Sequence, residues 1–319
     1  MSDEEPDDEN DTEEEVEEKK EEREVEVEVE GEGEGAVEEE EPQVSTSLNE
    51  EMVKEGLSLL CKTGNGLAHA FVKLEVREKH LLWLKVDNNR LISASIEELP
   101  YLQIASFANN HIKDCDGICH PRLVSLNLRS NAIEVLSGLN PNILSNLHTV
   151  ELRGNSLKST AGIYLPKLKN LYLGQNAISH LEDLENLEQL TTLHLRDNLI
   201  EVLEGFSSNM KSLQYLNLRG NAVAQVQELE KLQVLPMLRA LVLLENPCSD
   251  EAEYRLEALV LLPHLERLDK DFFEEEERNE AAEIRQRRKE EELELQKERE
   301  REKELEEAED TTQEDLTTE

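Results

Sequence analysis

Aromatic side chains are scarce in this 319-residue sequence, at 3% with a single tryptophan, so aliphatic residues must fill most of any core. Four cysteines (Cys61, Cys115, Cys119 and Cys248) are too few for a disulfide scaffold and indicate reduced intracellular thiols. No apolar run approaches the roughly 18 residues of a membrane span. The start, Met1–Glu5, lacks the basic and apolar segments of a secretory signal. The sequence therefore predicts a cytoplasmic protein with no membrane partner.

Positive charge is also in short supply, since 34 Lys and Arg face 74 Asp and Glu for a net charge of -40. Residues 1–41 carry -21 and residues 271–319 carry -13, which leaves -6 for the middle of the chain. Such a charge repels the phosphates of nucleic acids and anionic lipids, so neither is expected as a partner. Basic partners remain possible.

The N-terminal part divides into two predicted segments. Residues 1–43 are so rich in Glu and Asp that they cannot bury enough apolar surface to offset their ordering entropy, and we expect a disordered acidic tail. This tail either solvates the protein or serves as an acidic binding arm. Residues 44–80 form a predicted capping region with a helix over 48–61, capped by Asn49 and ended by Gly64.

A repeat of the form Leu-x-x-Leu-x-Leu-x-x-Asn-x-Leu runs through residues 81–246. In the copy at Asn131, the apolar positions hold Leu123, Leu126, Leu128 and Ile133. Successive asparagines are 21 to 25 residues apart, and the frame holds over eight copies: Asn89, Asn110, Asn131, Asn155, Asn176, Asn198, Asn221 and Asn246. The pattern predicts an α/β fold, a leucine-rich-repeat solenoid of the short-repeat kind with a curved parallel sheet on its concave face.

The eight asparagines have a predicted structural role. Each lies at a turn, where a buried amide must bond to backbone groups of its own and neighbouring coils. The convex side has room for a 3₁₀ or brief helical turn, but not for a long helix. Residues 247–271 resemble the C-terminal cap of short-repeat solenoids, with a helix over about 251–261. Residues 272–309 predict one charged, solvated helix, with a coiled coil as the alternative, and 310–319 a disordered tail.

Residues with catalytic or metal-binding chemistry are present but do not form a motif. Cys115, Cys119 and His120 lie close in sequence, yet Cys115 occupies a repeat position held by leucine elsewhere, which predicts a core residue. No second ligand pair lies in frame. The histidines are scattered, and no phosphate loop or dinucleotide motif is found. We therefore expect no enzyme, no cofactor, no metal and no small-molecule substrate.

The outward residues of each strand form two rows on the concave face, because parallel strands lie about 4.8 Å apart. Two residues before each Asn lie Asp87, Ala108, Arg129, Arg153, Gly174, Arg196, Arg219 and Leu244. Four residues before each Asn lie Lys85, Ser106, Asn127, Glu151, Tyr172, His194, Asn217 and Val242, with Tyr215 and Trp83 also facing outward. We call Arg129, Glu151, Arg153, Tyr172, His194, Arg196, Tyr215 and Arg219 the concave strip.

Two interpretations of the concave strip follow. The arginines either solvate an exposed sheet face, helped by Glu151, or bind an acidic segment of a partner or of the protein's own tails. The sequence favours the binding surface.

The middle of the chain resembles a family of leucine-rich-repeat proteins of the radial spokes in motile cilia and sperm flagella. The resemblance rests on the stretches Lys54–Ala70, Glu98–Ala108, His148–Asn155 and Leu238–Leu244, which include surface residues that the repeat does not dictate. It implies a non-catalytic scaffold in the cytoskeleton of the cilium or flagellum. Radial-spoke head components of the axoneme are the partners implied, and support of motility the role.

One departure from that family lies near residue 80. Asn89 follows Val76 by only thirteen residues, too few for a full coil, whereas the family carries about one and a half repeats more at this point. A splice form or a gene-model error that joins His80 to Leu81 would produce this junction. The N-terminal cap is then expected to dock poorly on the first full coil.

Two other classes of function fit parts of the sequence. Short leucine-rich repeats also occur in regulatory subunits of protein phosphatases, and acidic tails occur in nuclear histone-binding proteins. Copurified phosphatase activity would favour the first class, and salt-sensitive histone binding by the N-terminal tail would favour the second.

Overall fold

The computed structural model describes the backbone of residues 57–62, 69–74 and 81–316 and the side chains of residues 81–301. The predicted disordered tail 1–43, the first part of the predicted helix 48–61 and residues 317–319 lie outside the described residues. Ser45–Glu319 belong to one compact unit, which contains all of these described residues.

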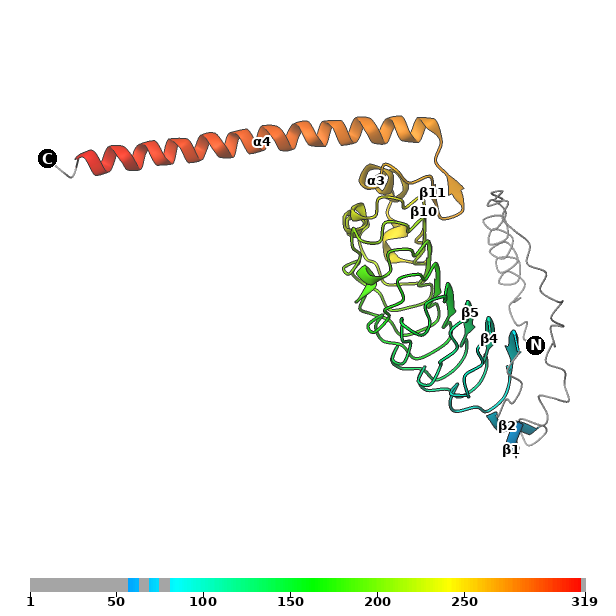
Figure 1. Cartoon of the computed structure of the whole chain (residues 1–319). Helices are drawn as coiled ribbons and strands as arrows, with labels where there is room; N and C mark the ends of the chain where they lie inside the picture. The colour runs from blue at the N-terminus through cyan, green and yellow to red at the C-terminus, as the bar shows by residue number, and fades with distance from the viewer. Residues whose placement is uncertain (1–56, 63–68, 75–80, 317–319) are drawn as a thin grey trace, which may run out of the picture. The chain divides into compact units, whose positions relative to one another are not determined.

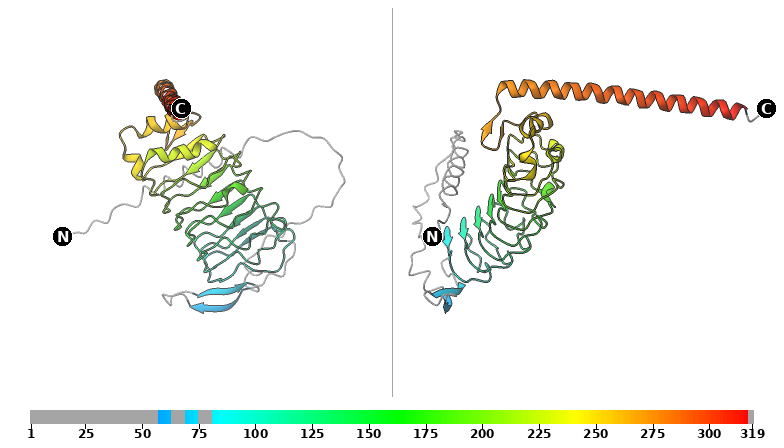
Figure 2. Two further views of the ribbon diagram at one scale, coloured as in Figure 1. Left: turned by 90° about the vertical axis from the view of Figure 1, so that its left-hand side faces the viewer. Right: turned by 180° about the vertical axis from the view of Figure 1, so that it is seen from behind.

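A ten-stranded sheet lines one face of the repeats, and the return segments form the other face (Figures 1 and 2). Its spatial order follows the chain from β3 to β12, and all pairs are parallel except β11 with β12. The strands are β3 (Trp83–Lys85), β4 (Ile104–Ser106), β5 (Ser125–Asn127), β6 (Thr149–Glu151), β7 (Asn170–Tyr172), β8 (Thr192–His194), β9 (Tyr215–Asn217), β10 (Ala240–Val242), β11 (Arg267–Leu268) and β12 (Asp271–Phe272). The predicted solenoid is confirmed.

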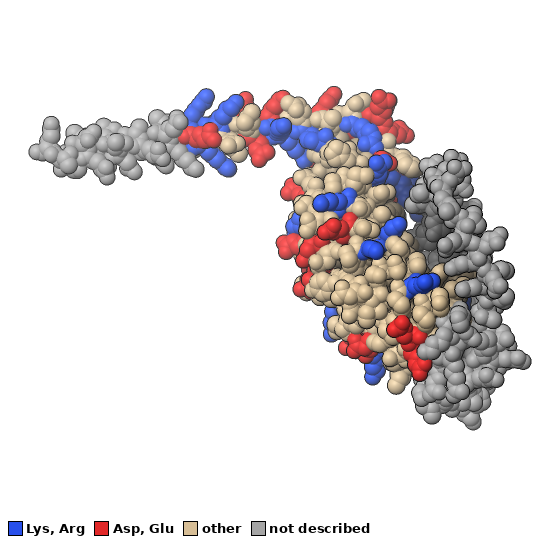
Figure 3. Space-filling model, in the orientation of Figure 1, with Lys and Arg blue, Asp and Glu red and all other residues tan. Residues whose placement is uncertain are grey.

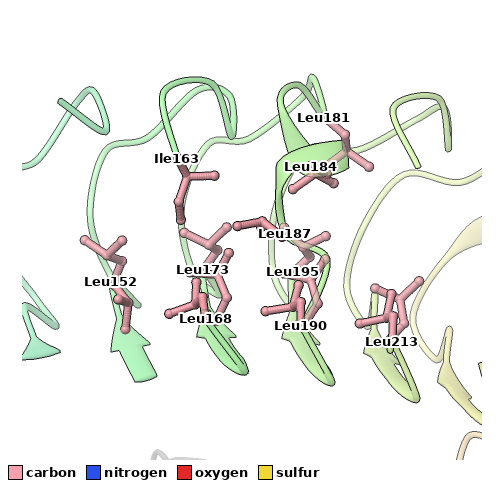
Figure 4. Packing of buried hydrophobic residues seen from close by; sticks show 14 of the residues in the cluster. Leu152, Ile163, Leu168, Leu173, Leu181, Leu184, Leu187, Leu190, Leu195 and Leu213 are labelled. Atoms are coloured by element: carbon pink, nitrogen blue, oxygen red, sulfur yellow. The ribbon is translucent and has the colours of Figure 1, made fainter. Parts of the chain in front are cut away.

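The core is built from leucines that occupy the same repeat position in consecutive coils. Leu152, Leu173 and Leu195 are fully buried and lie in one row, and Leu168 and Leu190 lie in a second row behind the strands (Figure 4). Each buried leucine contributes roughly 1.5–3 kcal/mol relative to an exposed one, and only the adjacent coil can cover it. The stack therefore stabilises its coils jointly.

The repeat asparagines join each coil to the coil before it. In the coil of Asn110, the side-chain nitrogen donates to Phe107 O at 2.9 Å and, across the coil boundary, to Val86 O at 3.1 Å. Its side-chain oxygen accepts the amide of Leu91 at 3.0 Å. The same pattern recurs at Asn131, Asn155, Asn176, Asn198, Asn221 and Asn246.

The residue before each repeat asparagine has a left-handed backbone. This position turns the chain out of the strand, and its positive φ disfavours bulky or β-branched residues. The eight residues there are Asn88, Asn109, Ser130, Gly154, Gln175, Asp197, Gly220 and Glu245, with φ between 54° and 68°. All are glycine or polar, a regularity that the leucine template alone does not contain.

The convex side carries only short helical turns, as its length per coil requires. They are the 3₁₀ segments η1 (Leu184–Asn186), η2 (Val226–Val234) and η3 (Pro247–Asp250). The helix α3 (Tyr254–Leu261) then covers the last coil, close to the expected cap helix. Within it, Ala258 and Leu259 are buried in the core.

The N-terminal capping region differs from the prediction. Where a helix was expected up to residue 61, the structure has the strand β1 (Leu57–Lys62), paired antiparallel with β2 (His69–Leu74). The apolar spacing of residues 52–60 fits a helix only if the segment is read alone. The β-forming run that includes Phe71 and Val72 supplies a pairing partner, and pairing overrides local propensity.

The helix α4 (Glu275–Leu316) is the last element described, and it extends seven residues beyond the predicted end of the charged helix, into the segment 310–319 that was expected to be disordered. Its first turns dock on α3, where Ala281 is fully buried and Arg288 binds Glu257 through two hydrogen bonds of 2.7 and 2.8 Å. From residue 289 to 301 every side chain is exposed. Basic and glutamate side chains are interspersed along this part of the helix (Figure 3), as expected for a solvated helix.

Candidate interaction surface

The concave strip follows the outward face of strands β5 to β9, with each of its four arginines two residues beyond the end of a strand. Leu126, Val150, Leu171, Leu193 and Leu216 are the central residues of these strands, and all are fully buried. Because side chains alternate across a strand, the residues on either side of each point outward. Strand pairing places Glu151 beside Tyr172, Tyr172 beside His194, and Thr192 beside Tyr215. The sheet therefore brings the residues of the predicted strip onto one face.

Three rings form a column at the centre of the strip. The His194 ring centroid lies 4.8 Å from that of Tyr172 and 5.1 Å from that of Tyr215, with interplanar angles of 30° and 39°. The guanidinium carbon of Arg267 lies 5.9 Å from the Tyr215 ring centroid, within cation–π range. Sequence reasoning placed the three rings on this face but missed Arg267, which lies beyond the last repeat asparagine.

His194 contributes no positive charge to the centre of the strip. His194 is 6% exposed, and burial lowers its pKa to about 3, with further lowering by the positive charges of Arg153 and Arg196. His194 is therefore neutral at physiological pH and contributes a ring rather than a charge. The positive charges of the strip are those of its arginines, and two of them, Arg196 and Arg219, lie against Asp197 and Glu245.

Gly174 lies between Arg153 and Arg196 in the row of outward residues. A Cβ atom placed on Gly174 would lie 3.2 Å from the carbonyl oxygen of Arg196, which is tight, and in ordinary contact with the side chains of Arg153 and Arg196 on either side, at 3.7 and 3.8 Å. The coil of Gly174 thus separates two pairs of arginines, Arg129 with Arg153 and Arg196 with Arg219. Neighbours within a pair are one strand spacing apart, about 4.8 Å.

Several polar groups of the strip are already used within the fold. Arg196 contacts Asp197 at 3.0 Å, and Arg219 contacts Glu245 at 2.6 Å. A side-chain oxygen of Glu151 accepts the backbone amide of Arg153 at 3.0 Å. The carboxylate of Glu151 therefore orients the strand end. The two ion pairs remain partly open to solvent, so a partner's carboxylate can compete for the arginines.

The cysteine and histidine cluster belongs to the core of the second coil. Cys115 is fully buried, and burial raises the pKa of its thiol to about 12, so it is not a reactive thiolate. His120 is fully buried and accepts the amide of Leu99 through Nδ1 at 3.2 Å. Among the residues that the structure describes, no three His, Cys, Asp or Glu side chains gather closely enough to hold a metal ion.

None of the helices described is both long enough and apolar enough to cross a membrane.

Comparison with known proteins identifies close relatives. A family described as leucine-rich repeat matches residues 162–298. The human protein named leucine-rich repeat-containing protein 23 is 61% identical over 281 residues, which cover 77% of this chain and 82% of the relative. The protein of that name from Xenopus tropicalis is 53% identical over 291 residues, covering 77% and 81%. The crystal structure of the Drosophila melanogaster SNF/U2A' complex matches with a TM-score of 0.36 and 27% identity, covering 50% of this chain and 79% of that chain.

The matched stretch is shorter in this chain than in the human relative. The alignment with the human protein is 281 residues long, but it includes only 77% of the 319 residues of this chain, which is about 246. About 35 positions of the relative therefore have no counterpart here. That shortfall equals about one and a half repeats at the spacing of 21 to 25 residues.

Proposed function

The chain belongs to the family of leucine-rich repeat-containing protein 23, and we propose that it is a scaffold of the axonemal radial spoke that supports ciliary and sperm flagellar motility. The repeats provide a rigid parallel sheet, and rigid repeat surfaces serve as protein-binding platforms. Its place is in the cytoskeleton of the cilium or flagellum, and its partners are radial-spoke head proteins. This placement rests on the family resemblance, since composition and fold alone fit many scaffolds.

The observation that carries the proposal of a binding surface is the concave strip itself. Four arginines and three aromatic rings lie on one continuous sheet in a protein of net charge -40. Arg and Tyr are the residues that most often anchor protein interfaces, and aromatic neighbours keep water away from charged contacts. The strip is therefore suited to an acidic segment of a partner protein.

The spacing of the arginines defines what that acidic segment must present. Arg129 and Arg153 are adjacent, as are Arg196 and Arg219, and the two pairs are separated by the coil of Gly174. Two carboxylates about 5 Å apart can bind the two arginines of one pair. A second pair of carboxylates about 10 Å further along the segment can bind the other pair of arginines. Each bidentate Arg–carboxylate contact adds orientation as well as affinity.

Affinity capture from testis or ciliated-cell extract tests the proposal, with quantitative mass spectrometry as the readout. The variant changes four arginines to Glu: Arg129, Arg153, Arg196 and Arg219. The control makes the same charge change at four exposed lysines outside the strip: Lys113, Lys158, Lys167 and Lys211. Loss of radial-spoke proteins with the strip variant alone is the expected result.

Two further results would count against the proposal. Capture of a phosphatase or of histones in place of spoke proteins would assign the chain to another class of scaffold. Equal loss with the lysine control would show that overall charge, and not the strip, determines binding. A second strip variant with Gln at the four positions keeps the test valid if the Glu variant unfolds, and thermal unfolding of each variant establishes that it is folded.

A further inference from the structure

An exposed apolar pair lies at the N-terminal end of the concave face. Trp83 is 66% exposed and Ile104 is 42% exposed, although most large apolar side chains of the repeats are buried. Strand pairing places the two side by side, at the first position of β3 and β4. Trp83 is the only tryptophan of the chain. We call Trp83 and Ile104 the apolar end.

The apolar end shares its face with the concave strip. Leu84 and Ala105, the next residues of the two strands, are buried, so Trp83 and Ile104 point to the opposite, outward side. The same register row continues through Ser125, Thr149, Asn170 and Thr192 to Tyr215. Polar residues fill the interval between the apolar end and Tyr215, so the apolar character is confined to the first two strands.

The distance between the two regions follows from sheet geometry. With strands 4.8 Å apart and a rise of about 3.3 Å per residue, the backbone at Ile104 lies about 14 Å from that at Arg129 and about 23 Å from that at Arg196. An extended segment of about 4 to 7 residues spans this interval, as does a helix of about 9 to 15 residues. One partner segment can therefore reach both regions.

We propose that the concave face is bipartite and binds a partner protein's segment that combines an acidic cluster with a large apolar side chain at one end of it. The acidic cluster binds the arginines, and the apolar side chain packs on Trp83 and Ile104. The proposal rests on the proposed function of the strip and adds to it the composition and the orientation of the partner. Tryptophan is enriched at the anchor points of interfaces, and the charged centre alone would not fix which way the segment runs.

Fluorescence of the single tryptophan tests the proposal directly in the full chain. One probe is a synthetic peptide of eight glutamates. The second probe adds a six-residue Gly-Ser spacer and a terminal Leu-Phe-Leu to the same peptide. The anchored peptide is expected to bind about tenfold more tightly and to shift the Trp83 emission to the blue, because its apolar end removes water from the indole. The purely acidic peptide is expected to bind without that shift.

Variants separate the two halves of the site. Ile104→Ser is expected to remove the added affinity of the anchored peptide and leave the acidic peptide unaffected. Ile92→Ser is the matched control, because Ile92 is 65% exposed and lies outside the strands. The variant with Gln at the four strip arginines is expected to lose both peptides.

The outcomes distinguish this inference from the proposed function. Equal affinity of the two peptides with an unchanged Trp83 emission would overturn the bipartite site and leave the cationic strip intact. Binding of the anchored peptide to the Gln variant as tightly as to the wild type would overturn the acidic contact, and with it the proposed function of the strip. Absence of binding by either peptide would overturn both.

Discussion

The hydroxyl of Tyr254 donates a 3.1 Å hydrogen bond to Oδ2 of Asp269, while Oδ1 of Asp269 accepts the amides of Leu243 and Leu244 at 2.7 and 3.1 Å. Tyr254 begins α3, and Asp269 follows the last parallel strand. This carboxylate therefore joins the cap helix to the final repeat coil. It also accepts hydrogen bonds from two backbone amides of that coil, which has no further repeat coil after it.

Loss of this Tyr–Asp bond is expected to loosen the C-terminal cap. Tyr254→Phe removes a hydrogen bond to a charged acceptor, and the Tyr254 side chain is only 8% exposed. The substitution should lower the free energy of unfolding by about 1.5–3 kcal/mol. Tyr164→Phe is a matched control, because Tyr164 is 47% exposed and also binds an aspartate, Asp183, at 3.1 Å. It should cost less than about 1 kcal/mol. Urea denaturation measures both, and equal losses would show that burial does not strengthen the bond.

Replacement of one repeat asparagine should destabilise two coils. Asn198→Leu leaves the amide of Ile178 and the carbonyls of Leu173 and Leu195 without their side-chain partner, at a cost of about 3 kcal/mol or more. Hydrogen exchange should accelerate at Ile178, in the preceding coil. Asn209→Ala, at an exposed asparagine, should change neither stability nor exchange. Unchanged protection of Ile178 in Asn198→Leu would contradict the prediction.

Acid should destabilise the repeats through buried histidines. Burial lowers the pKa of His120 to about 4, against about 6.5 in the unfolded chain. Between these values the unfolded chain binds a proton that the folded chain does not, so stability falls as the pH falls, by about 2 kcal/mol at pH 5. Above pH 6.5 the effect vanishes, and below about 4 it stops growing.

His120→Gln tests this linkage, because its amide oxygen can replace Nδ1 as acceptor for Leu99. The stability of this variant should fall less steeply between pH 7 and 5 than that of the wild type, as followed by urea titrations at each pH. His264→Gln, at an exposed histidine, serves as the control. Parallel pH profiles for all three proteins would rule out His120 as the source of the acid sensitivity.

Arg285 should hold α4 against the cap. Its guanidinium donates to the carbonyls of Leu259 and Val260 at 2.9 and 3.0 Å, near the C-terminal end of α3 where carbonyls lack helical partners. Arg285→Ala should weaken docking by about 1–2 kcal/mol and raise hydrogen exchange in residues 275–288, with the repeats unchanged. Arg287→Ala is the control, because Arg287 lies two residues after Arg285 on the same helix and is exposed. This variant should leave hydrogen exchange as in the wild type.

The solenoid could be predicted because its signal is periodic. Leucine and asparagine recur in one frame, and each repeat position has a single structural role, so burial, strand position and the outward rows all follow from counting residues. The outward placement of Tyr172, His194 and Arg196 required no more than this frame. Their contacts did not follow from it, since the stacking of Tyr172 on His194 and the ion pair of Arg196 with Asp197 depend on side-chain conformation.

The N-terminal hairpin could not be predicted in the same way. The segment before Lys62 has apolar residues compatible with either helix or strand, and only its partner, His69–Leu74, decides between them. A Gly-Asn-Gly run separates the two strands in the sequence and was the one available signal for a hairpin. The role of Asp269 at the C-terminal cap was likewise not predicted. A cap residue occurs once in the chain, so no repeated pattern indicates its role.

The bonds between coils bear on how such a chain can change length during evolution. Each asparagine accepts an amide of the preceding coil, as Asn110 does from Leu91 and Asn131 from Ile112. Loss of the last coil would leave such an amide without its acceptor, and loss of the first would do the same to the amide of His111, which donates to Leu91 O. Whole coils should therefore be gained or lost within the stack, where the new neighbours restore the same bonds, while both ends stay invariant.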